Sequence, residues 1–190
     1  MTPPDAVIKV GGSLLGWPGL PGRLADYLEA RRGDRLVLVV GGGRFADALR
    51  GLDAAHGLGE ARSHALALRV LDLTARVLAD LAPGLEVVED PAALPETWAA
   101  GRTPILAPRH FLEADDRSPD PLPHAWTTTT DAIAARLAVR LGARELALLK
   151  STPLPPGATL IEAARLGLVD PEFPRAASEL RKLSFVDMKM

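Results

Sequence analysis

The chain has 190 residues, of which 47% are hydrophobic, and 22 lysines and arginines oppose 24 aspartates and glutamates. This hydrophobic fraction is enough for the core of one domain, and a formal net charge of -2 provides no general positive field for nucleic acid or an anionic membrane. The absence of cysteine excludes disulfide bonds, a thiolate nucleophile and cysteine-ligated metal sites.

The N-terminal sequence MTPPDAVIKVGG has neither the basic start nor the long apolar stretch of a secretory signal. No apolar run elsewhere in the sequence is long enough to span a bilayer. We therefore expect a cytoplasmic protein that binds neither a membrane nor nucleic acid.

Short apolar runs alternate along the chain with segments of helical periodicity. The runs, which are typical of buried strands, are residues 7–10, 36–40, 85–89, 104–108 and 146–150. The helical segments are residues 20–32, a stretch with Phe45, Leu49 and Leu52, a long stretch with Leu66, Val70, Leu73, Val77 and Leu81, and residues 130–141 with Ile133, Leu137 and Leu141. Because parallel strands need long crossovers, this alternation predicts a three-layer α/β/α sandwich with a mainly parallel central sheet.

Residues 113–124 interrupt this pattern, since they are acidic and rich in proline. Such a composition favours a surface loop, which divides the chain into two halves. A second proline cluster, Pro153, Pro155 and Pro156, follows the last predicted strand, and the remainder of the chain is short.

Two predicted strands run directly into glycine-rich turns. The turns are Gly11, Gly12 and Ser13 after the first strand, and Gly41, Gly42, Gly43 and Arg44 after the second. Unobstructed backbone N–H groups at such turns hold phosphate oxygens. Open α/β sheets bind ligands at the carboxyl ends of their strands, and Lys9 lies close to such an end. The glycines also suit simple tight turns with Lys9 in solvent, but two such turns at one edge of a sheet favour sites for a donor and an acceptor.

Two common nucleotide-binding motifs are not matched. No G-x-x-x-x-G-K-[ST] stretch occurs, which excludes a P-loop enzyme. Gly41, Gly43 and Ala46 fit G-x-G-x-x-A, but the acidic residue expected about 20 positions later at a strand end is missing. A dinucleotide-binding site is therefore not favoured.

The sequence HAWTTTTD places hydroxyl groups and Asp131 at the start of the last long predicted helix. Threonine and aspartate also serve as ordinary helix caps, but four consecutive threonines exceed what capping needs. Lys150 ends the predicted strand LALLK, so it would be a second ammonium group at the same edge as Lys9. Phosphoryl transfer depends on positioning and on positive charge around the transferred group, and an aspartate that orders two lysines would supply both.

The histidines, His56, His64, His110 and His124, are too scattered for a metal cluster, and we predict no metal site on the protein. His64 is the best candidate among them for contact with an acceptor. Trp126 either covers the acceptor or fills a gap in the core.

Three segments, VIKVGGSLL, VVGGGRFADALR and TTTTDAIAARLAVRLGARELALLKS, together resemble the signature regions of the amino-acid-kinase superfamily. This superfamily includes kinases of acetylglutamate, aspartate, uridylate, carbamate, isopentenyl phosphate and fosfomycin. The GGGRFAD stretch, the SHALAL segment and HAWTTTTD are most similar to the short archaeal-type kinases of methanofuran biosynthesis, which phosphorylate an aminomethylfuran-methyl phosphate to the diphosphate.

The resemblance implies a kinase that uses ATP, with Mg²⁺ carried mainly by the ATP phosphates, and a small anionic acceptor. It implies one domain, residues 1–190, with an acceptor-side lobe at 1–112 and an abbreviated nucleotide-side lobe at 124–190. The implied catalytic residues are Lys9, Asp131 and Lys150. The implied nucleotide and phosphate contacts are Gly11, Gly12, Ser13, Lys150 and Ser151. The implied acceptor contacts are Gly41, Gly42, Gly43, Arg44, His64, Trp126, Thr127 and Thr128.

The sequence departs from the superfamily after its last signature region. The usual members continue into a longer nucleotide lobe whose glycine-rich segment carries another lysine, and here only Lys182 or Lys189 is available for that role. Two alternatives therefore stay open: a binding or assembly subunit with reduced catalysis, and a kinase that converts a carboxylate to an acylphosphate. The long apolar helix around residues 66–81 exceeds what one small domain can cover, which predicts a homodimer.

Overall fold

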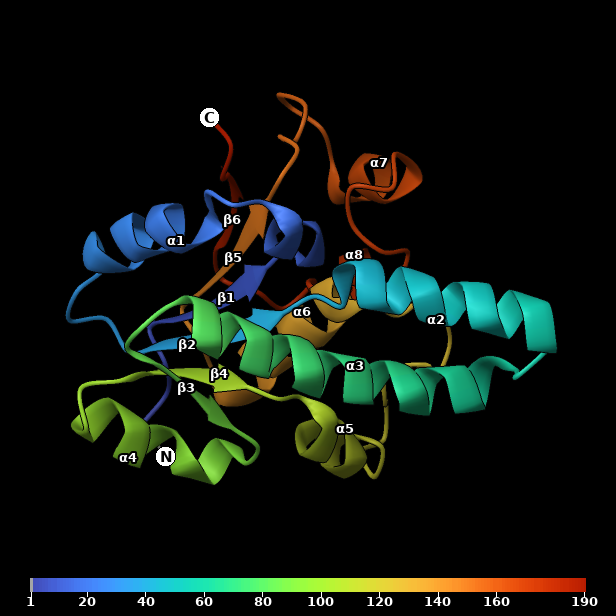
Figure 1. Ribbon diagram of the computed structural model, residues 1–190, viewed down its shortest axis with the longest axis horizontal. Coiled ribbons are helices and arrows are strands. Elements are labelled where there is room, and N and C mark those ends of the chain that lie inside the picture. Colours follow the sequence, from blue (N-terminus) through green and yellow to red (C-terminus); the bar gives the residue numbers. More distant parts are fainter. Residues whose placement is uncertain (1) are drawn as a thin grey trace.

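The computed structural model describes residues 2–190 and contains a six-stranded sheet in the order β3-β4-β2-β1-β5-β6 (Figure 1). The strands are β1 (Ala6–Val10), β2 (Leu36–Val40), β3 (Leu85–Val88), β4 (Thr103–Leu106), β5 (Glu145–Lys150) and β6 (Leu183–Asp187). Each pair of neighbouring strands in this order is parallel. The predicted α/β sandwich is confirmed, and its sheet is parallel throughout the described residues.

Three central strands end side by side at one edge of the sheet. Val10, the last residue of β1, is in register with Val40 of β2 and with Leu149 of β5. Because the strands are parallel, the segments that follow them all leave from the same edge, which we call the carboxyl edge. Both glycine turns and Lys150 therefore lie there.

Helices cover both faces of the sheet. The α-helices are α1 (Leu20–Glu29), α2 (Gly43–His56), α3 (Glu60–Leu81), α4 (Leu94–Ala99), α5 (Arg109–Asp115), α6 (Thr130–Leu141), α7 (Leu160–Arg165) and α8 (Phe173–Ala176). There are also two short 3-10 helices among the described residues. η1 (Gly12–Gly16) follows β1, and η2 (Pro91–Ala93) precedes α4. The α1 helix and part of α3 pack on one face, and α6 with its neighbours packs on the other.

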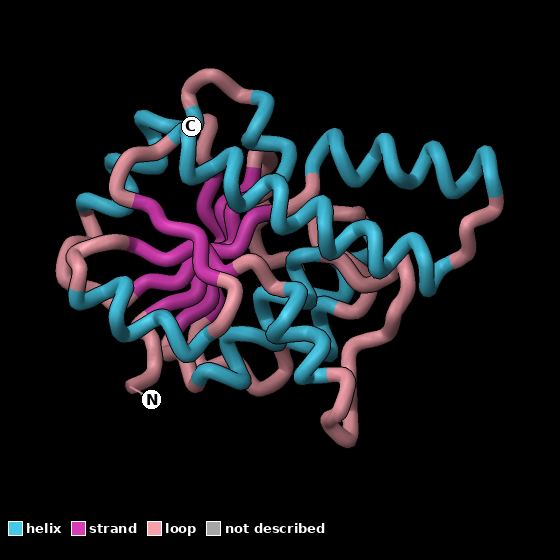
Figure 2. Tube along the Cα trace, turned by 60° about the horizontal axis from the view of Figure 1, so that its bottom comes forward, coloured by secondary structure: helices cyan, strands magenta, loops and turns pink. Residues whose placement is uncertain are grey.

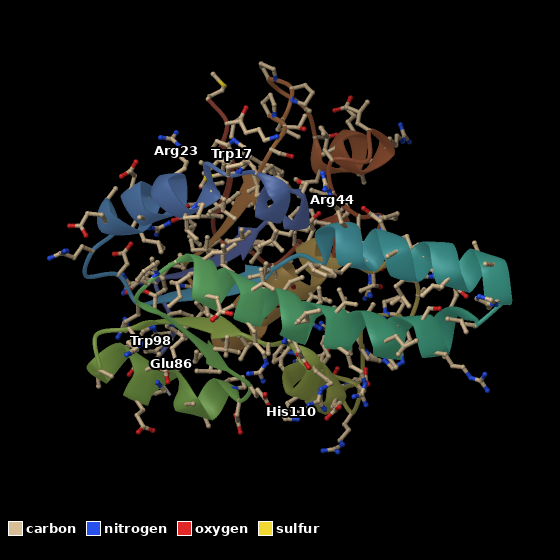
Figure 3. The ribbon with its side chains drawn as sticks, viewed as in Figure 1. Trp17, Arg23, Arg44, Glu86, Trp98 and His110 are labelled. Carbon is tan, nitrogen blue, oxygen red and sulfur yellow. The ribbon has the colours of Figure 1, made fainter. Side chains whose placement is uncertain are left out.

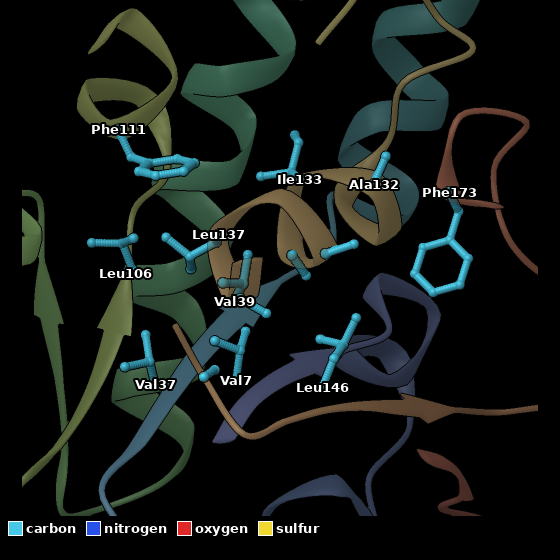
Figure 4. Packing of buried hydrophobic residues seen from close by; sticks show 14 of the residues in the cluster. Val7, Val37, Val39, Leu106, Phe111, Ala132, Ile133, Leu137, Leu146 and Phe173 are labelled. Atoms are coloured by element: carbon cyan, nitrogen blue, oxygen red, sulfur yellow. The ribbon is translucent and has the colours of Figure 1, made fainter. Parts of the chain in front are cut away.

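Alternate side chains of β1 enter two different cores. Ile8 belongs to the core beneath α1, whereas Val7 belongs to the core beneath α6. Figure 4 shows the second core, in which Val7 lies near Val39 and Leu137. Because strand side chains alternate between faces, Lys9 lies on the same face as Val7 and emerges beneath the start of α6.

The helices α2 and α3 form a hairpin that extends past the carboxyl edge of the sheet (Figure 2). Gly57 ends α2 in the left-handed conformation, with φ 62° and ψ 46°, which glycine adopts without strain. The hairpin therefore lies beside the carboxyl ends of β1 and β2.

The buried face of α3 is not the one that the leucine spacing predicted. Of the apolar residues at that spacing, Leu66, Leu73 and Leu81 are exposed. The residues of α3 that pack on the protein are instead His64, Leu68, Leu71, Ala75 and Leu78. The helix carries apolar residues on two sides, and periodicity alone does not tell which side meets the sheet. In α2, likewise, only Leu49 is buried, while Phe45 and Leu52 are exposed.

The predicted surface loop at residues 113–124 is wrong at its start. Helix α5 continues to Asp115, whose buried carboxylate receives hydrogen bonds from Arg136 at 2.9 Å and Arg140 at 3.1 Å. The acidic residue belongs to an ion-pair cluster between α5 and α6, a long-range contact that local composition does not reveal.

The C-terminal segment contains more structure than the sequence indicated. Strand β6 pairs with β5, and α7 and α8 were not predicted. Lys182, considered above as a replacement for a catalytic lysine, pairs with Glu145 at the amino end of β5, with 3.3 Å between Nζ and Oε1. It therefore lies at the end of the sheet opposite Lys150.

Candidate functional site

The two glycine turns touch each other at the carboxyl edge. A Cβ atom at Gly41 would lie 2.6 Å from the backbone nitrogen of Gly12, which is closer than real side chains approach. Gly43 adopts a φ of 51°, in the left-handed region that favours glycine. The glycines are therefore needed to let two backbones meet, whatever ligand they also hold.

Asp131 lies between the two lysines on the α6 side of these turns. Its Oδ1 is 2.8 Å from Lys9 Nζ, and its Oδ2 is 2.7 Å from Lys150 Nζ. Lys150 also donates a hydrogen bond of 2.8 Å to the carbonyl oxygen of Leu168. The exposed fraction of the side chain is 7% for Lys9, 17% for Lys150 and 6% for Asp131. One carboxylate thus forms ion pairs with two ammonium groups, both of which are nearly buried.

The charges in this cluster shift its ionisation. Burial disfavours the charged form of Asp131, but the positive charges of Lys9 and Lys150 outweigh it and lower the pKa of the carboxyl group. Burial and the like charge of Lys9 lower the pKa of Lys150 to about 8, against the attraction of Asp131. Asp131 is therefore a stable anion with little tendency to take a proton, while Lys150 is charged at neutral pH and loses its proton in mildly alkaline solution.

Asp170, between α7 and α8, supports the start of α6. Its Oδ2 accepts hydrogen bonds from the Thr129 backbone N–H at 3.0 Å, the Thr129 hydroxyl at 2.8 Å and the Ala132 N–H at 3.0 Å. Its Oδ1 is buried and has no hydrogen-bond partner within residues 2–190. Burial and the negative charge of Asp131 raise the pKa of Asp170, although the hydrogen bonds oppose this. Asp170 fixes the turn that delivers Asp131.

A cavity of about 380 Å³ opens between the glycine turns, the hairpin and α6. Its wall includes Lys9, Gly12, Gly43 and the threonines at the start of α6. The N-termini of α2 and α6 both contribute to this wall, and each helix carries partial positive charge at that end. This part of the cavity is therefore suited to an anion.

Thr128 and His64 bring polar groups to the cavity wall. The Thr128 hydroxyl is buried and has no hydrogen-bond partner in the described part of the chain, which is unusual for a native protein and indicates a ligand or water there. Burial, together with the nearby His124, lowers the pKa of His64, so its imidazole is neutral at pH 7.

The structure gathers many of the predicted site residues around this cavity. Those that line it are Lys9, Gly12, Ser13, Gly41, Gly42, Gly43, His64, Trp126 and Thr128. Ser13 also contacts Ser151, with 3.0 Å between their hydroxyl oxygens. Lys150 and Asp131 lie directly behind Lys9 in the ion-pair cluster.

Three predicted contacts lie elsewhere. The Gly11 N–H donates a hydrogen bond of 2.8 Å to the Leu149 carbonyl, so it is not free to hold phosphate. Arg44 extends toward η1, where its guanidinium lies beside Gly16 (Figure 3). Thr127 is exposed and is not part of the cavity wall. Arg44 was predicted for its place next to the glycines, but the first turn of α2 points it away.

Arg50 and Asp170 were not among the predicted site residues. Arg50 lines the cavity two helical turns after Gly43, on the side of α2 that faces the loop before α6. Helical spacing from the glycines is the one signal that could have found it. For Asp170 there was no signal, because its contact with Thr129 joins residues 41 positions apart.

Comparison with known proteins places these features in context. Residues 6–153 match the model of the amino acid kinase family. A curated relative, the [5-(aminomethyl)furan-3-yl]methyl phosphate kinase of Methanocaldococcus jannaschii, is 27% identical over 141 residues. The match covers 74% of this chain and 62% of the relative, so the chain spans less than two thirds of the relative's length.

Solved structures of nucleotide kinases share the fold. The uridylate kinase of Archaeoglobus fulgidus aligns with a TM-score of 0.67 and 18% identity, over 97% of this chain and 92% of that one. The UMP kinase of Ureaplasma parvum aligns with a TM-score of 0.64 and 14% identity, over 97% and 90% of the two chains. At these identities the likeness concerns the fold alone. No helix within residues 2–190 has the length and apolarity needed to cross a membrane.

Replacement of Asp170 tests its role as a support for α6. Asp170→Ala is expected to lower the free energy of unfolding by about 2 kcal/mol, because it leaves buried N–H groups of α6 unsatisfied. Asp170→Asn, which keeps an oxygen acceptor, should cost about half as much. Urea unfolding followed by circular dichroism measures both.

The control is Asp120→Ala, which removes an exposed carboxylate paired with Arg175. Exposed ion pairs contribute about 0–1 kcal/mol, so little change is expected. Equal losses for Asp120→Ala and Asp170→Ala would show that the hydrogen bonds at the start of α6 do not matter.

Proposed function

The chain belongs to the amino acid kinase family, and from this premise we propose that it is an ATP-dependent kinase whose acceptor is a small phosphate ester. The observation that carries the proposal is the single carboxylate of Asp131 between two nearly buried ammonium groups, next to a cavity suited to an anion. Such a cluster has one more positive than negative charge. The negative charge of an incoming phosphate group would balance this excess.

In the proposed reaction an oxygen of the acceptor phosphate attacks the γ-phosphorus of ATP. The bond from this phosphorus to the β-bridging oxygen breaks, ADP leaves, and the acceptor becomes a diphosphate ester. A phosphate oxygen is already ionised at pH 7, so no general base is needed. Asp131, with its lowered pKa, then acts by ordering Lys9 and Lys150 rather than by accepting a proton.

The lysines would stabilise the charge that spreads over the transferred group and the leaving oxygen. Lys9 reaches the cavity from β1, and Lys150 lies behind it at the end of β5. We assign Gly12, Ser13 and Ser151 to the ATP phosphates and Gly41–Gly43 with Thr128 to the acceptor phosphate. Mg²⁺ would enter with the ATP phosphates and supply further positive charge there.

The curated relative supports a phosphorylated acceptor. Its printed activity is that of a kinase acting on a phosphate, [5-(aminomethyl)furan-3-yl]methyl phosphate. We propose an acceptor of the same chemical kind for this chain, in the biosynthesis of a methanofuran-like carrier of one-carbon units in the cytoplasm. A binding subunit without catalysis and a carboxylate kinase are the alternatives that the experiments below separate.

We also propose a homodimer formed through α3. Leu66, Leu73 and Leu81 are 41%, 46% and 40% exposed at a spacing of about two helical turns, which leaves an apolar stripe on a long helix. A second copy of the same stripe is its simplest complement, since a two-fold axis pairs identical surfaces.

Light scattering with size-exclusion chromatography is expected to give twice the chain mass. Leu73→Glu should shift the protein to the monomer, because it places a charge in the centre of the apolar stripe. Leu166→Glu, which puts the same charge at an exposed leucine outside α3, is the control and should leave the dimer intact. A wild-type protein that is monomeric at all concentrations would contradict the proposal.

The kinase proposal is tested by release of ADP from Mg-ATP in the presence of candidate phosphate esters. Lys9→Met is expected to lower kcat by about 10²-fold or more, because it removes charge next to the transferred group. Because Lys150 has a pKa of about 8 and works as a cation, kcat/KM should fall as the pH rises above 8. Lys150→Arg, which stays protonated, should move that fall to higher pH.

The control is Lys182→Met, which removes a lysine at the opposite end of the sheet and should keep full activity. If no ester is turned over and titration calorimetry detects no ATP binding, the kinase proposal fails and a binding subunit is favoured. Trapping with hydroxylamine would reveal an acylphosphate and so identify a carboxylate kinase.

A further inference from the structure

The loop between α5 and α6, residues 116–129, supplies Trp126 and Thr128 to the cavity wall. Two contacts fasten Trp126 to α2. Its indole N–H donates a hydrogen bond of 2.7 Å to Asp53 Oδ2, and the Arg50 guanidinium lies 4.8 Å from the centre of its ring. The hydrogen bond from Trp126 lowers the pKa of Asp53, so this carboxylate stays charged in mild acid, and arginine is always protonated. These two contacts therefore keep their charges between about pH 5 and pH 8.

A third contact of the same loop can change its charge. His124 stacks on His64 of α3, with 4.6 Å between ring centres and 7° between ring planes. On the loop itself, His124 Nε2 lies 2.7 Å from Asp116 Oδ1. Histidine is the side chain that gains a proton between about pH 8 and pH 5, and two protonated rings in this stack would be like charges face to face. The stack therefore favours at most one charged ring.

The surroundings of the two rings decide which of them stays neutral. The His124 side chain is 48% exposed and faces the Asp116 carboxylate, so a proton on it keeps water and an anion beside it. His64 is only 8% exposed. Burial, and then the nearby His124, lower the pKa of His64 against the weaker attraction of Asp116. While the rings are stacked, His64 is therefore the neutral partner.

Charged groups on the other neighbouring elements do not reverse this preference. Lys9 of β1 and Arg50 of α2 line the same cavity as His64, and both cations disfavour a further positive charge there. Asp47 of α2 also lines the cavity, but its side chain is 70% exposed and is paired with Arg50. Glu60 lies one turn before His64 on α3 and is exposed too. Water weakens the attraction of both carboxylates for a proton on His64.

We propose that the His64–His124 stack is a pH-sensitive latch on the α5–α6 loop. The latch is closed while His64 is neutral, and a proton on His64 separates the rings and releases Trp126 from the cavity wall. The latch is independent of the proposed kinase function, because it changes the shape of the cavity whatever the cavity binds.

The direction of the pH effect follows from the protons that each form binds. In the open loop His64 is in water, where a histidine takes up its proton near pH 6.5. In the closed loop the pKa of His64 is lower, so the closed form binds fewer protons and loses stability as the pH falls below about 6.5. The ratio of open to closed loop should therefore rise by up to about tenfold from pH 7.5 to pH 5.5.

Hydrogen exchange of the tryptophan indole N–H groups, followed by NMR in the full chain, measures this opening. The chain has three tryptophans, and the Trp126 signal is the one that is absent from Trp126→Phe. After correction for the intrinsic exchange rate at each pH, exchange of the Trp126 N–H is expected to rise severalfold, up to about tenfold, from pH 7.5 to pH 5.5. The Trp98 N–H, which donates to the Leu36 carbonyl, is the internal control and should not follow the same profile.

Variants assign the effect to His64. His64→Phe keeps a flat ring against which His124 can stack but takes up no proton, so the rise for Trp126 should disappear. His110→Phe, the same substitution at an exposed histidine of α5, should keep the rise. Continued protection of the Trp98 N–H shows that each variant is folded.

Three results would overturn the latch: exchange of Trp126 that does not rise in the wild type, an equal rise in folded His64→Phe, or a rise that Trp98 follows in parallel. The last result would mean that the whole domain opens and not the loop alone. If His64→Phe does not fold, the wild-type comparison of Trp126 with Trp98 decides alone.

Discussion

The candidate site depends on one electrostatic constraint: a single buried carboxylate must stabilise two ammonium groups. Two cations at this depth repel each other and lose hydration, and without Asp131 they would cost several kcal/mol. With Asp131 only one of the two positive charges is balanced. At neutral pH the cluster therefore carries one positive charge that no carboxylate balances, and an anion bound in the adjacent cavity, beside the two helix N-termini, can balance it.

The parallel sheet is what makes this arrangement possible. Lys9 and Lys150 lie on adjacent strands, β1 and β5, at the same end of the sheet. Helix α6 crosses the face beneath which Lys9 emerges, so the first turn of the helix delivers Asp131 to both ammonium groups. Asp170 holds that turn in place with three hydrogen bonds, and the Gly12 and Gly43 backbones approach closely enough to bring the acceptor wall to the same point.

The sequence predicted the parts of this site that follow from local pattern. The strands, the glycine turns and α6 are visible as short apolar runs, repeated glycines and helical spacing, and parallel order then brings their ends together. The face of α3, the contact of Asp170 and the direction of Arg44 were not predictable, because each depends on packing between distant segments. Leu73 and Leu78 are equally apolar, and only the sheet decides which is buried. Strand β6, half-buried at the edge, has no continuous apolar run to reveal it.

The most direct test of the central claim is the titration of Lys150 in the wild type and in Asp131→Asn, followed by NMR of lysine side chains. If Asp131 compensates both ammonium groups, its neutralisation leaves Lys150 beside the charge of Lys9 alone, and the pKa of Lys150 should fall below its wild-type value of about 8. Asp120→Asn, which neutralises an exposed carboxylate paired with Arg175 away from the cavity, should leave that titration unchanged. A pKa of Lys150 that is the same or higher in Asp131→Asn would contradict the account.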